Sequence, residues 1–571
     1  MPETIITLSF NCIQIIGRFI RGAIWERRMM QLRSRITMEK LLACGLAALL
    51  VLMTSLAAGA AEDRNVLRLG LQSDKFTQMN AFVLPWGNGA VFGMTHIPLA
   101  TFKPDLGIGP CLAESWETSP DGKSIKFHLV KNATWHDGMP VTADDVAFSF
   151  EYWKKIEKSD ARGNWYGSYL DHAKAIDGST VELVFNESVA AVTLASQIPI
   201  TYIVPEHIWK DVKKPKEYNG TDALVGCGPF IFEKFDSDAQ IAYLKANPDY
   251  FAGKPTVDAI EWRYFRSLDT LLLALKKGEI DAKADYYQPV SGIYAADLVK
   301  ADDVDLVIVP DIGVPLHLVF GFKQYPTNTT AFRQAVSYAI DYQALKEMIA
   351  AGYGEIPGIG YSSPALPGFD SDLPKLEYNA TKAKDLLNQS GFIDRDGDGL
   401  REAPGGGKLR MPITPDTKPQ YVRAAEVISQ NLHKVGLDVY VESLSSDALR
   451  KKLWTDRDYF MAVRYSTPYA NLAGDTAAEY YVNLPGMFGT STDPKILEIV
   501  NEAIRSKDMD ELSQNRKAIQ QYVAREQPVI ALIWGDAIYP VRTDRWEGWT
   551  PMYGYGPVNY WSWFSLRPVE N

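Results

Sequence analysis

Cysteine and histidine are scarce in this sequence. The 571 residues include four Cys and seven His, and none of them shows the short spacing at which these side chains bind zinc or attach haem. We therefore expect no metal and no cofactor. Gly-x-Ser-x-Gly and His-Glu-x-x-His motifs are also missing from the sequence. These are signatures of common hydrolases, so an enzyme is not the first interpretation.

Positive charge is in short supply as well. The chain has 59 Lys and Arg against 70 Asp and Glu, which gives a formal net charge of −11. A protein that binds nucleic acid needs a basic face, so we expect no nucleic-acid partner. Apolar residues, in contrast, make up 46% of the chain. Because a single core stops growing at about 250–300 residues, a chain of this length is expected to form at least two lobes.

A long apolar run occurs near the amino terminus. Residues 41–56 are mostly apolar, basic residues precede them within positions 33–40, and small residues follow at 57–61. This order is typical of a secretory signal peptide. The run is shorter than the ~20 residues that span a membrane, and a membrane anchor is the alternative. We predict that residues 1–61 are a signal peptide with a doubtful upstream extension before Met29, and that the protein is periplasmic.

Two cysteines remain beyond this segment, Cys111 and Cys227. An oxidising compartment permits a disulfide between them, but a disulfide also requires their Cα atoms to lie close together, which the sequence does not establish. Two buried thiols are the favoured interpretation.

Residues 112–153 combine a strand, two turns and a capped helix. Ile125, Phe127 and Leu129 alternate with polar residues after an Asp-Gly turn, which predicts a half-buried strand. Thr142 is placed to cap the following helix. The spacing i, i+4, i+7 predicts one apolar helix face, made of Val146, Phe150 and Trp153.

This stretch resembles the signature region of the family 5 extracellular solute-binding proteins, the dipeptide- and oligopeptide-binding components of ABC transporters. It contains LAESW, then S-x-DG and a strand, then WHDGMPVTADDV, with Trp135 in place of the usual Phe. Residues 225–230 resemble the family's GTGP turn with Cys227 replacing Thr, and residues 333–341 resemble its RQA-x-x-YAID helix.

The resemblance implies an α/β fold, a two-lobed periplasmic-binding-protein fold of the large, three-subdomain type. We expect lobe I to comprise residues 62–312 and 520–571, with an inserted subdomain at about 104–224, and lobe II to comprise residues 313–519. On this division, the strands predicted at Val66–Leu71 and Val529–Trp534 share lobe I.

The resemblance also implies a function. A monomeric protein of this family captures a peptide or peptide-like ligand between its lobes and delivers it to the permease and ATPase subunits of an ABC importer.

Ligand contacts are expected on the strand that leaves lobe II. There the family has a pattern close to R-x-G-W-x-x-D-Y, and residues 464–471 read RYSTPYAN. The family's aspartate, which pairs with the amino terminus of a peptide, falls at Ala470, so a contact of ~1.5–3 kcal/mol is lost. A glycine-rich loop at 82–93 supplies further candidates. The predicted ligand-binding residues are Arg464, Tyr465, Ser466, Thr467, Tyr469, Asn471, Trp86 and Asn88.

Other ligands and other functions stay open at this point. Tryptophan faces stack on sugars, and the chain has 14 Trp, so an oligosaccharide-binding protein of the same fold is the alternative; an opine-like ligand is also compatible, and a secreted enzyme is less favoured. The tryptophans near the carboxyl terminus that suggest a sugar are Trp546, Trp549, Trp561 and Trp563.

One further motif resembles a calcium loop. Residues 394–399 place aspartates at positions 1, 3 and 5 and a glycine at position 6. The twelfth position is Gly405, whereas a calcium loop requires glutamate there. A solvated turn is therefore the favoured interpretation.

Overall fold

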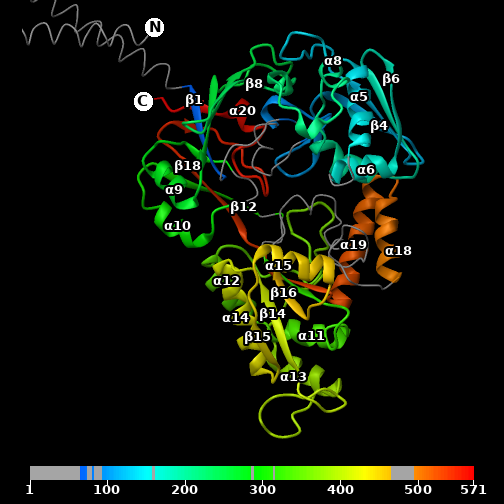
Figure 1. Ribbon diagram of the computed structural model, residues 1–571, viewed down its shortest axis with the longest axis vertical. Coiled ribbons are helices and arrows are strands. Elements are labelled where there is room, and N and C mark those ends of the chain that lie inside the picture. The colour runs from blue at the N-terminus through cyan, green and yellow to red at the C-terminus, as the bar shows by residue number, and fades with distance from the viewer. Residues whose placement is uncertain are drawn as a thin grey trace, which may run out of the picture. The chain divides into compact units, whose positions relative to one another are not determined.

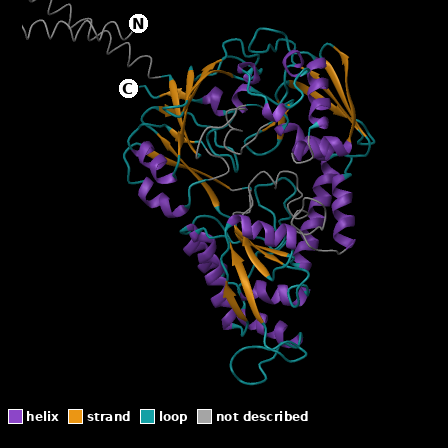
Figure 2. Cartoon of the chain, in the orientation of Figure 1, coloured by secondary structure: helices purple, strands orange, loops and turns teal. Residues whose placement is uncertain are grey.

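The computed structural model describes residues 65–73, 80, 82, 93–156, 161–284, 289–310, 312, 316–464 and 494–570. The chain from Val66 onward forms one compact unit of mixed helices and strands (Figure 2). The predicted signal peptide, residues 1–61, lies outside the described residues. No helix in the part that the structure describes is both long enough and apolar enough to span a membrane.

The first sheet has seven strands, with β1 near its centre (Figure 1). β1 pairs in parallel with β10 and β11, and Leu67, Leu69 and Leu71 point to its buried face. Helices α9 (Leu268–Lys276) and α10 (Gly292–Leu298) cover the other face. In spatial order the strands are β12 (Val304–Pro310), β18 (Asp536–Arg542), β11 (Ala282–Lys283), β1 (Val66–Gln72), β10 (Ala259–Phe265), β9 (Ile241–Ala246) and β8 (Phe230–Asp236).

A second, antiparallel sheet of four strands is formed within the segment predicted as an insertion. Helix α5 (Ala143–Lys155) begins with the predicted cap. The Asp145 backbone N–H donates to Thr142 Oγ1 at 3.3 Å, and the Thr142 N–H donates to Asp145 Oδ2 at 2.9 Å, which is a capping box. The strands, in order, are β4 (Ala113–Thr118), β5 (Ser124–Leu129), β7 (Thr180–Phe185) and β6 (Leu170–Asp177).

The third sheet has five strands and is covered by helices on both faces. Its strands, in order, are β15 (Asp438–Val441), β14 (Arg410–Pro415), β16 (Met461–Arg464), β13 (Leu316–Phe320) and β17 (Val529–Ile533). One face packs on α11 (Thr330–Ala339), α12 (Tyr342–Ala350), α13 (Ala380–Gln389) and α14 (Pro419–Lys434). The other face packs on α15 (Ser446–Arg450), a π-helical turn (Lys451–Asp456), α18 (Pro494–Ile504) and α19 (Met509–Glu526).

The remaining α-helices and β-strands of the described residues are short and lie around the first two sheets. They are β2 (Ala100–Phe102), β3 (Ile108–Pro110), α6 (Ala161–Tyr169), α7 (Ala190–Val192), α8 (Glu206–Trp209), β19 (Trp546–Glu547), α20 (Ser562–Ser565) and β20 (Arg567–Pro568).

The predicted placement of Val529–Trp534 in lobe I is wrong. β17 pairs antiparallel with β13, so that Ile530 lies opposite Leu318 in the five-stranded sheet. The chain reaches the seven-stranded sheet only with the next strand, β18, which pairs with β12 and β11. Because β17 and β18 are both buried along nearly their whole length, their apolar pattern does not say which sheet each one joins. The crossover lies at Gly535, not near residue 520, and the other predicted lobe boundaries stay a prediction.

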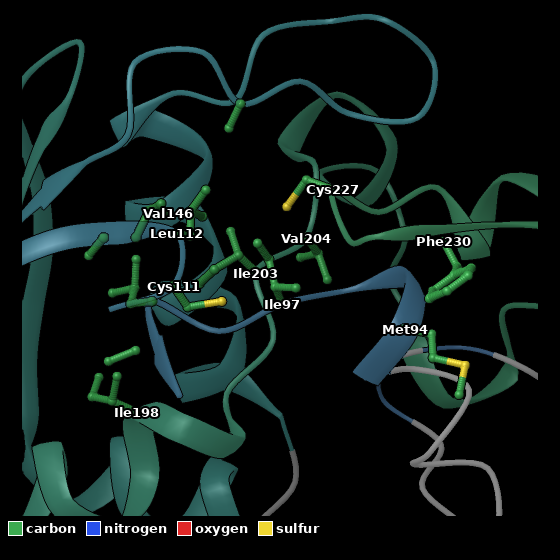
Figure 3. Packing of buried hydrophobic residues seen from close by; sticks show 14 of the residues in the cluster. Met94, Ile97, Cys111, Leu112, Val146, Ile198, Ile203, Val204, Cys227 and Phe230 are labelled. Atoms are coloured by element: carbon green, nitrogen blue, oxygen red, sulfur yellow. The ribbon is translucent and has the colours of Figure 1, made fainter. Parts of the chain in front are cut away.

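Cys111 and Cys227 are free thiols in the apolar core that the seven-stranded and four-stranded sheets share. Figure 3 shows both among aliphatic side chains that include Ile97 and Val204. Burial raises the pKa of the Cys111 thiol to about 12 and raises the pKa of Cys227 further above its ordinary value. Since the reactive form of cysteine is the thiolate, neither side chain is a nucleophile near neutral pH.

The turn that carries Cys227 requires its two glycines. A Cβ on Gly226 would lie 1.9 Å from the carbonyl oxygen of Thr95, and a Cβ on Gly228 would lie 2.3 Å from that of Met94. Only glycine permits two backbones to approach so closely. The resemblance to the GTGP turn therefore reflects packing of the scaffold.

Candidate functional site

One edge of the five-stranded sheet gathers the residues that can contact a ligand. β14 runs parallel to both β15 and β16, and β13 runs antiparallel to β16. The carboxyl end of β16, with Arg464, therefore lies beside the amino end of β13, with His317. Ligands of open α/β sheets bind outside the carboxyl ends of the parallel strands, so this edge is the candidate site.

The same edge adjoins both connections between the two large sheets. β12 ends at Pro310, opposite Asp536 at the start of β18. The chain passes from β12 to β13 of the five-stranded sheet, and it returns from β17 of that sheet to β18. β11 is antiparallel to β18, so the carboxyl end of β11 lies at this edge of the seven-stranded sheet. It carries Lys283, whose side chain is buried.

Aromatic residues lie beneath Arg464. Arg464 and His317 are direct partners on neighbouring antiparallel strands, and residues opposite one another in such a pair point to the same face. The His317 ring is fully buried and packs edge-on against Tyr361, with ring centroids 5.9 Å apart. Tyr361 in turn packs against Trp534, at 6.3 Å. Arg464 thus lies beside a row of packed aromatic rings.

Trp454 lies directly against Arg464. The Arg464 Cζ atom lies over the Trp454 ring, 5.4 Å from its centroid, and the Arg450 Cζ atom lies over the same ring at 5.3 Å. Arg450 ends α15 and Trp454 belongs to the π-helical turn, which Figure 1 places at this edge of the sheet. Each stack contributes ~0.5–1 kcal/mol at an exposed site.

The positive charge of Arg464 affects the pKa of a tyrosine on the neighbouring helix α14. Burial raises the pKa of Tyr421 well above its ordinary value, the charge of Asp416 adds to this rise, and Arg464 opposes it. Asp416 accepts hydrogen bonds from the Lys418 backbone N–H, at 3.2 Å, and from the Ser446 hydroxyl. It thereby ties the end of β14 to the start of α15.

Among the predicted ligand-binding residues, Arg464 alone falls within the described part of the chain, and the structure places it at the candidate site. The others lie outside the described residues: Tyr465, Ser466, Thr467, Tyr469, Asn471, Trp86 and Asn88. His317, Tyr361 and Trp454 were not predicted. No local motif marks them, because the pairing of β13 with β16 brings His317 beside Arg464 and ring contacts place Tyr361 against His317 and Trp454 against Arg464.

The tryptophans near the carboxyl terminus pack inside the protein. Trp546 and Trp563 are buried, and Trp549 is partly buried against the same core. Trp546 Nε1 donates to Asp281 Oδ2 at 3.2 Å, and Trp561 Nε1 donates to the Phe102 carbonyl oxygen at 2.8 Å. Packing explains why tryptophan occurs at these positions, so these residues do not favour a sugar as the ligand.

The aspartates of the calcium-like loop are exposed, and their oxygen atoms lie within 4.8 Å of one another. A lysine already balances them, since Lys408 Nζ lies 3.0 Å from Asp396 Oδ2 and also contacts Asp398. Asp394 accepts hydrogen bonds from the backbone N–H groups of Gly397 and Gly399, at 2.7 and 2.9 Å. These contacts describe a turn that is complete without an ion.

We predict that calcium does not stabilise the protein. A ligand raises the melting temperature only if it binds the native state selectively, and here an ammonium group occupies the position of a cation. Differential scanning calorimetry with and without millimolar CaCl₂ should give the same melting temperature to within about 1 °C. A rise of many degrees would show that the loop at 394–399 binds the ion.

The two large sheets with their helices, joined by two crossovers beside Arg464, define a two-lobed binding protein. The model of the bacterial extracellular solute-binding proteins, family 5, matches residues 107–483, and the chain belongs to this family. The prediction of family and of fold class from residues 112–153 is thereby confirmed.

Individual relatives agree with this assignment. The chain is 25% identical to the dipeptide-binding protein of Escherichia coli over 377 residues, which cover 62% of this chain and 68% of that protein. It is 25% identical over 504 residues to the probable D,D-dipeptide-binding periplasmic protein DdpA of E. coli, covering 85% and 91% of the two chains. The substrate-binding protein CtaP of Listeria monocytogenes has the same fold, with a TM-score of 0.74 at 20% identity over 88% of this chain and 99% of that one.

Proposed function

We propose that this protein is the periplasmic binding component of an ABC importer and captures a peptide or peptide-like ligand between its lobes. The observation that carries the proposal is the position of Arg464. It lies at the carboxyl end of β16, beside His317 and next to both connections between the large sheets. A ligand held there contacts the part of the molecule through which one lobe moves against the other.

Relatives support a peptide-like ligand. Of the two E. coli proteins to which the chain is similar, one is a dipeptide-binding protein and the other is described as a probable D,D-dipeptide-binding periplasmic protein. An arginine suits such ligands because its planar fork of donors holds a carboxylate or carbonyl groups with two parallel hydrogen bonds. We propose that Arg464 binds the ligand in this way, together with residues 465–471 and with Trp86 and Asn88.

The proposal includes the location and the partners. A signal peptide at residues 1–61 would export the chain, and the mature protein would act as a monomer that docks on the permease of the transporter, whose ATPase subunits drive import. We propose no catalytic step, because the family is one of solute-binding proteins and the buried thiols have raised pKa values.

Isothermal titration calorimetry of the mature protein tests the proposal. Di- to pentapeptides are titrated first, followed by cello- and manno-oligosaccharides. Saturable binding of at least one peptide class supports the proposal. Binding of sugars alone would transfer the function to the oligosaccharide alternative, and hydrolysis of the peptides during titration would indicate an enzyme.

Ala470→Asp should improve affinity for ligands with a free amino group. This change restores the carboxylate that members of the family are expected to carry at this position, and a hydrogen bond to a charged group contributes ~1.5–3 kcal/mol. Calorimetry with a dipeptide and its amino-acetylated form measures the gain, which should be confined to the free amine. An equal gain for both forms would show that residue 470 does not face the amino terminus.

A further inference from the structure

We propose that Arg450, Trp454 and Arg464 together form a recognition site for an acidic side chain, so that the protein prefers anionic peptides to neutral ones of the same size. This inference rests on the proposed function and specifies its ligand class. The three residues are called the arginine–tryptophan stack below.

The geometry of the stack is not that of an ordinary helix surface. Arg450 and Trp454 are four residues apart, and such neighbours on a helix often touch. Arg464, however, comes from the end of strand β16, and its guanidinium carbon lies as close to the Trp454 ring, at 5.4 Å, as that of Arg450 does, at 5.3 Å. Two cations from different elements are therefore held on one indole at the candidate site.

The exposure of Trp454 also needs an explanation. Its relative exposure of 36% makes it the one tryptophan among the large exposed apolar residues in the described part of the chain. It lies on a π-helical turn, Lys451–Asp456, and such turns occur frequently at functional sites. A ring that orients two guanidinium groups at the ligand-binding edge accounts for both features.

The charged residues in the segment that carries the stack are mostly basic. Residues 446–464 contain five basic and three acidic side chains, a local excess of positive charge in a chain whose net charge is −11. The neighbouring lysines are paired, Lys451 with Asp456 at 2.6 Å and Lys452 with Glu442 at 2.7 Å. Among the described residues, no carboxylate forms an ion pair with Arg450 within 4.0 Å.

A carboxylate fits this arrangement chemically. A guanidinium stacked on an aromatic ring keeps its N–H groups in its own plane, where they are directed past the ring edge. Two such groups present donors to the oxygens of one carboxylate or of two nearby carboxylates, and charge-assisted bidentate pairs are the stronger class of hydrogen bond. In the proposed site, Arg450 and Arg464 bind the acidic group and Trp454 is a positioning residue.

Matched tripeptides test the inference by calorimetry. The peptides are alanine tripeptides with a single Glu, or the isosteric Gln, at the first, second or third position. We expect the wild-type protein to bind the best Glu peptide at least about tenfold more tightly than its Gln counterpart. Arg450→Gln should reduce this ratio to about threefold or less, because the affinity for the Glu peptide should fall more than the affinity for the Gln peptide.

Lys451→Gln is the matched control, because it removes the same charge from the adjacent residue, which is already paired with Asp456. It should leave the Glu/Gln ratio unchanged. Trp454→Phe should retain the preference and Trp454→Leu should lose it, with melting temperatures confirming that both variants fold.

Two results would overturn the inference while the proposed function stands. These are wild-type binding of Glu and Gln peptides with equal affinity, and equal effects of Arg450→Gln and Lys451→Gln on the ratio. The second result would assign the preference to the long-range field of the protein. If neither these tripeptides nor the wider peptide set bound, the proposed function would fail and the inference with it.

Discussion

Arg464→Ala is expected to weaken peptide binding by ~2–4 kcal/mol, the range for removing one member of a desolvated charged pair. Arg464 lies beside the buried His317 on the neighbouring strand, and its guanidinium carbon lies 5.4 Å from the centroid of the Trp454 ring, so it is oriented before the ligand arrives. Its removal leaves the ligand's acidic or carbonyl group without these donors.

Calorimetry of wild-type and variant protein against the best-binding peptide measures this loss. Arg464→Lys keeps the charge but not the planar fork, and it should recover only part of the affinity. Arg423→Ala is the control on a neighbouring helix, because Arg423 is exposed and pairs with Glu426 at 3.5 Å. Peptide affinity that is the same in wild type and Arg464→Ala would remove Arg464 from the site.

The second large effect is a loss of stability in mild acid. Burial lowers the pKa of His96 to about 3 and that of His136 to about 4. In the unfolded chain both imidazoles take up protons near pH ~6.5. Below that pH the unfolded chain binds protons that the native state excludes, so the free energy of unfolding falls as the pH falls. The stability is fully present above pH ~6.5 and is lost as the pH decreases toward the two lowered values.

Burial is the largest cause of the lowered pKa of His136, and its hydrogen bonds define the neutral tautomer. The Gly226 backbone N–H donates to His136 Nδ1 at 3.3 Å, and His136 Nε2 lies 3.1 Å from the Gly228 carbonyl oxygen. This pattern requires the tautomer with its proton on Nε2, and a proton on Nδ1 would face the Gly226 N–H. His96 is fully buried, and the nearby His136 lowers its pKa further.

Each histidine should cost about 2 kcal/mol of stability between pH 6.5 and 5, since one pKa unit corresponds to ~1.4 kcal/mol. Urea unfolding at several pH values measures this slope. His136→Gln should remove about half of it, whereas His433→Gln, at an exposed position of α14, should leave it unchanged. A stability independent of pH between 6.5 and 5 would contradict the buried neutral imidazoles.

Local structure could be predicted from the sequence where neighbouring residues determine it. The cap at Thr142 and the alternation of Ile125, Phe127 and Leu129 appear in the structure as predicted, because both depend on contacts within a few residues. The pairing of strands does not. β17 was predicted in the wrong sheet, since two buried strands separated by Trp534 and Gly535 offer the same apolar pattern to either partner.

The candidate site was predicted only where a family motif covers it. Arg464 followed from the resemblance of residues 464–471 to the ligand-facing strand. His317 is 147 residues away in the chain and becomes its neighbour through the pairing of β13 with β16. Trp454 is marked by its stack with Arg464 and by its exposure, and neither can be deduced from periodicity.

Native mass spectrometry of the protein purified from its own periplasm tests the central claim most directly. The account predicts a mature chain that begins near residue 61 or 62 and carries a bound peptide or peptide-like molecule, which denaturation releases and fragmentation identifies. A bound oligosaccharide, with no peptide-like species in any preparation, would contradict it.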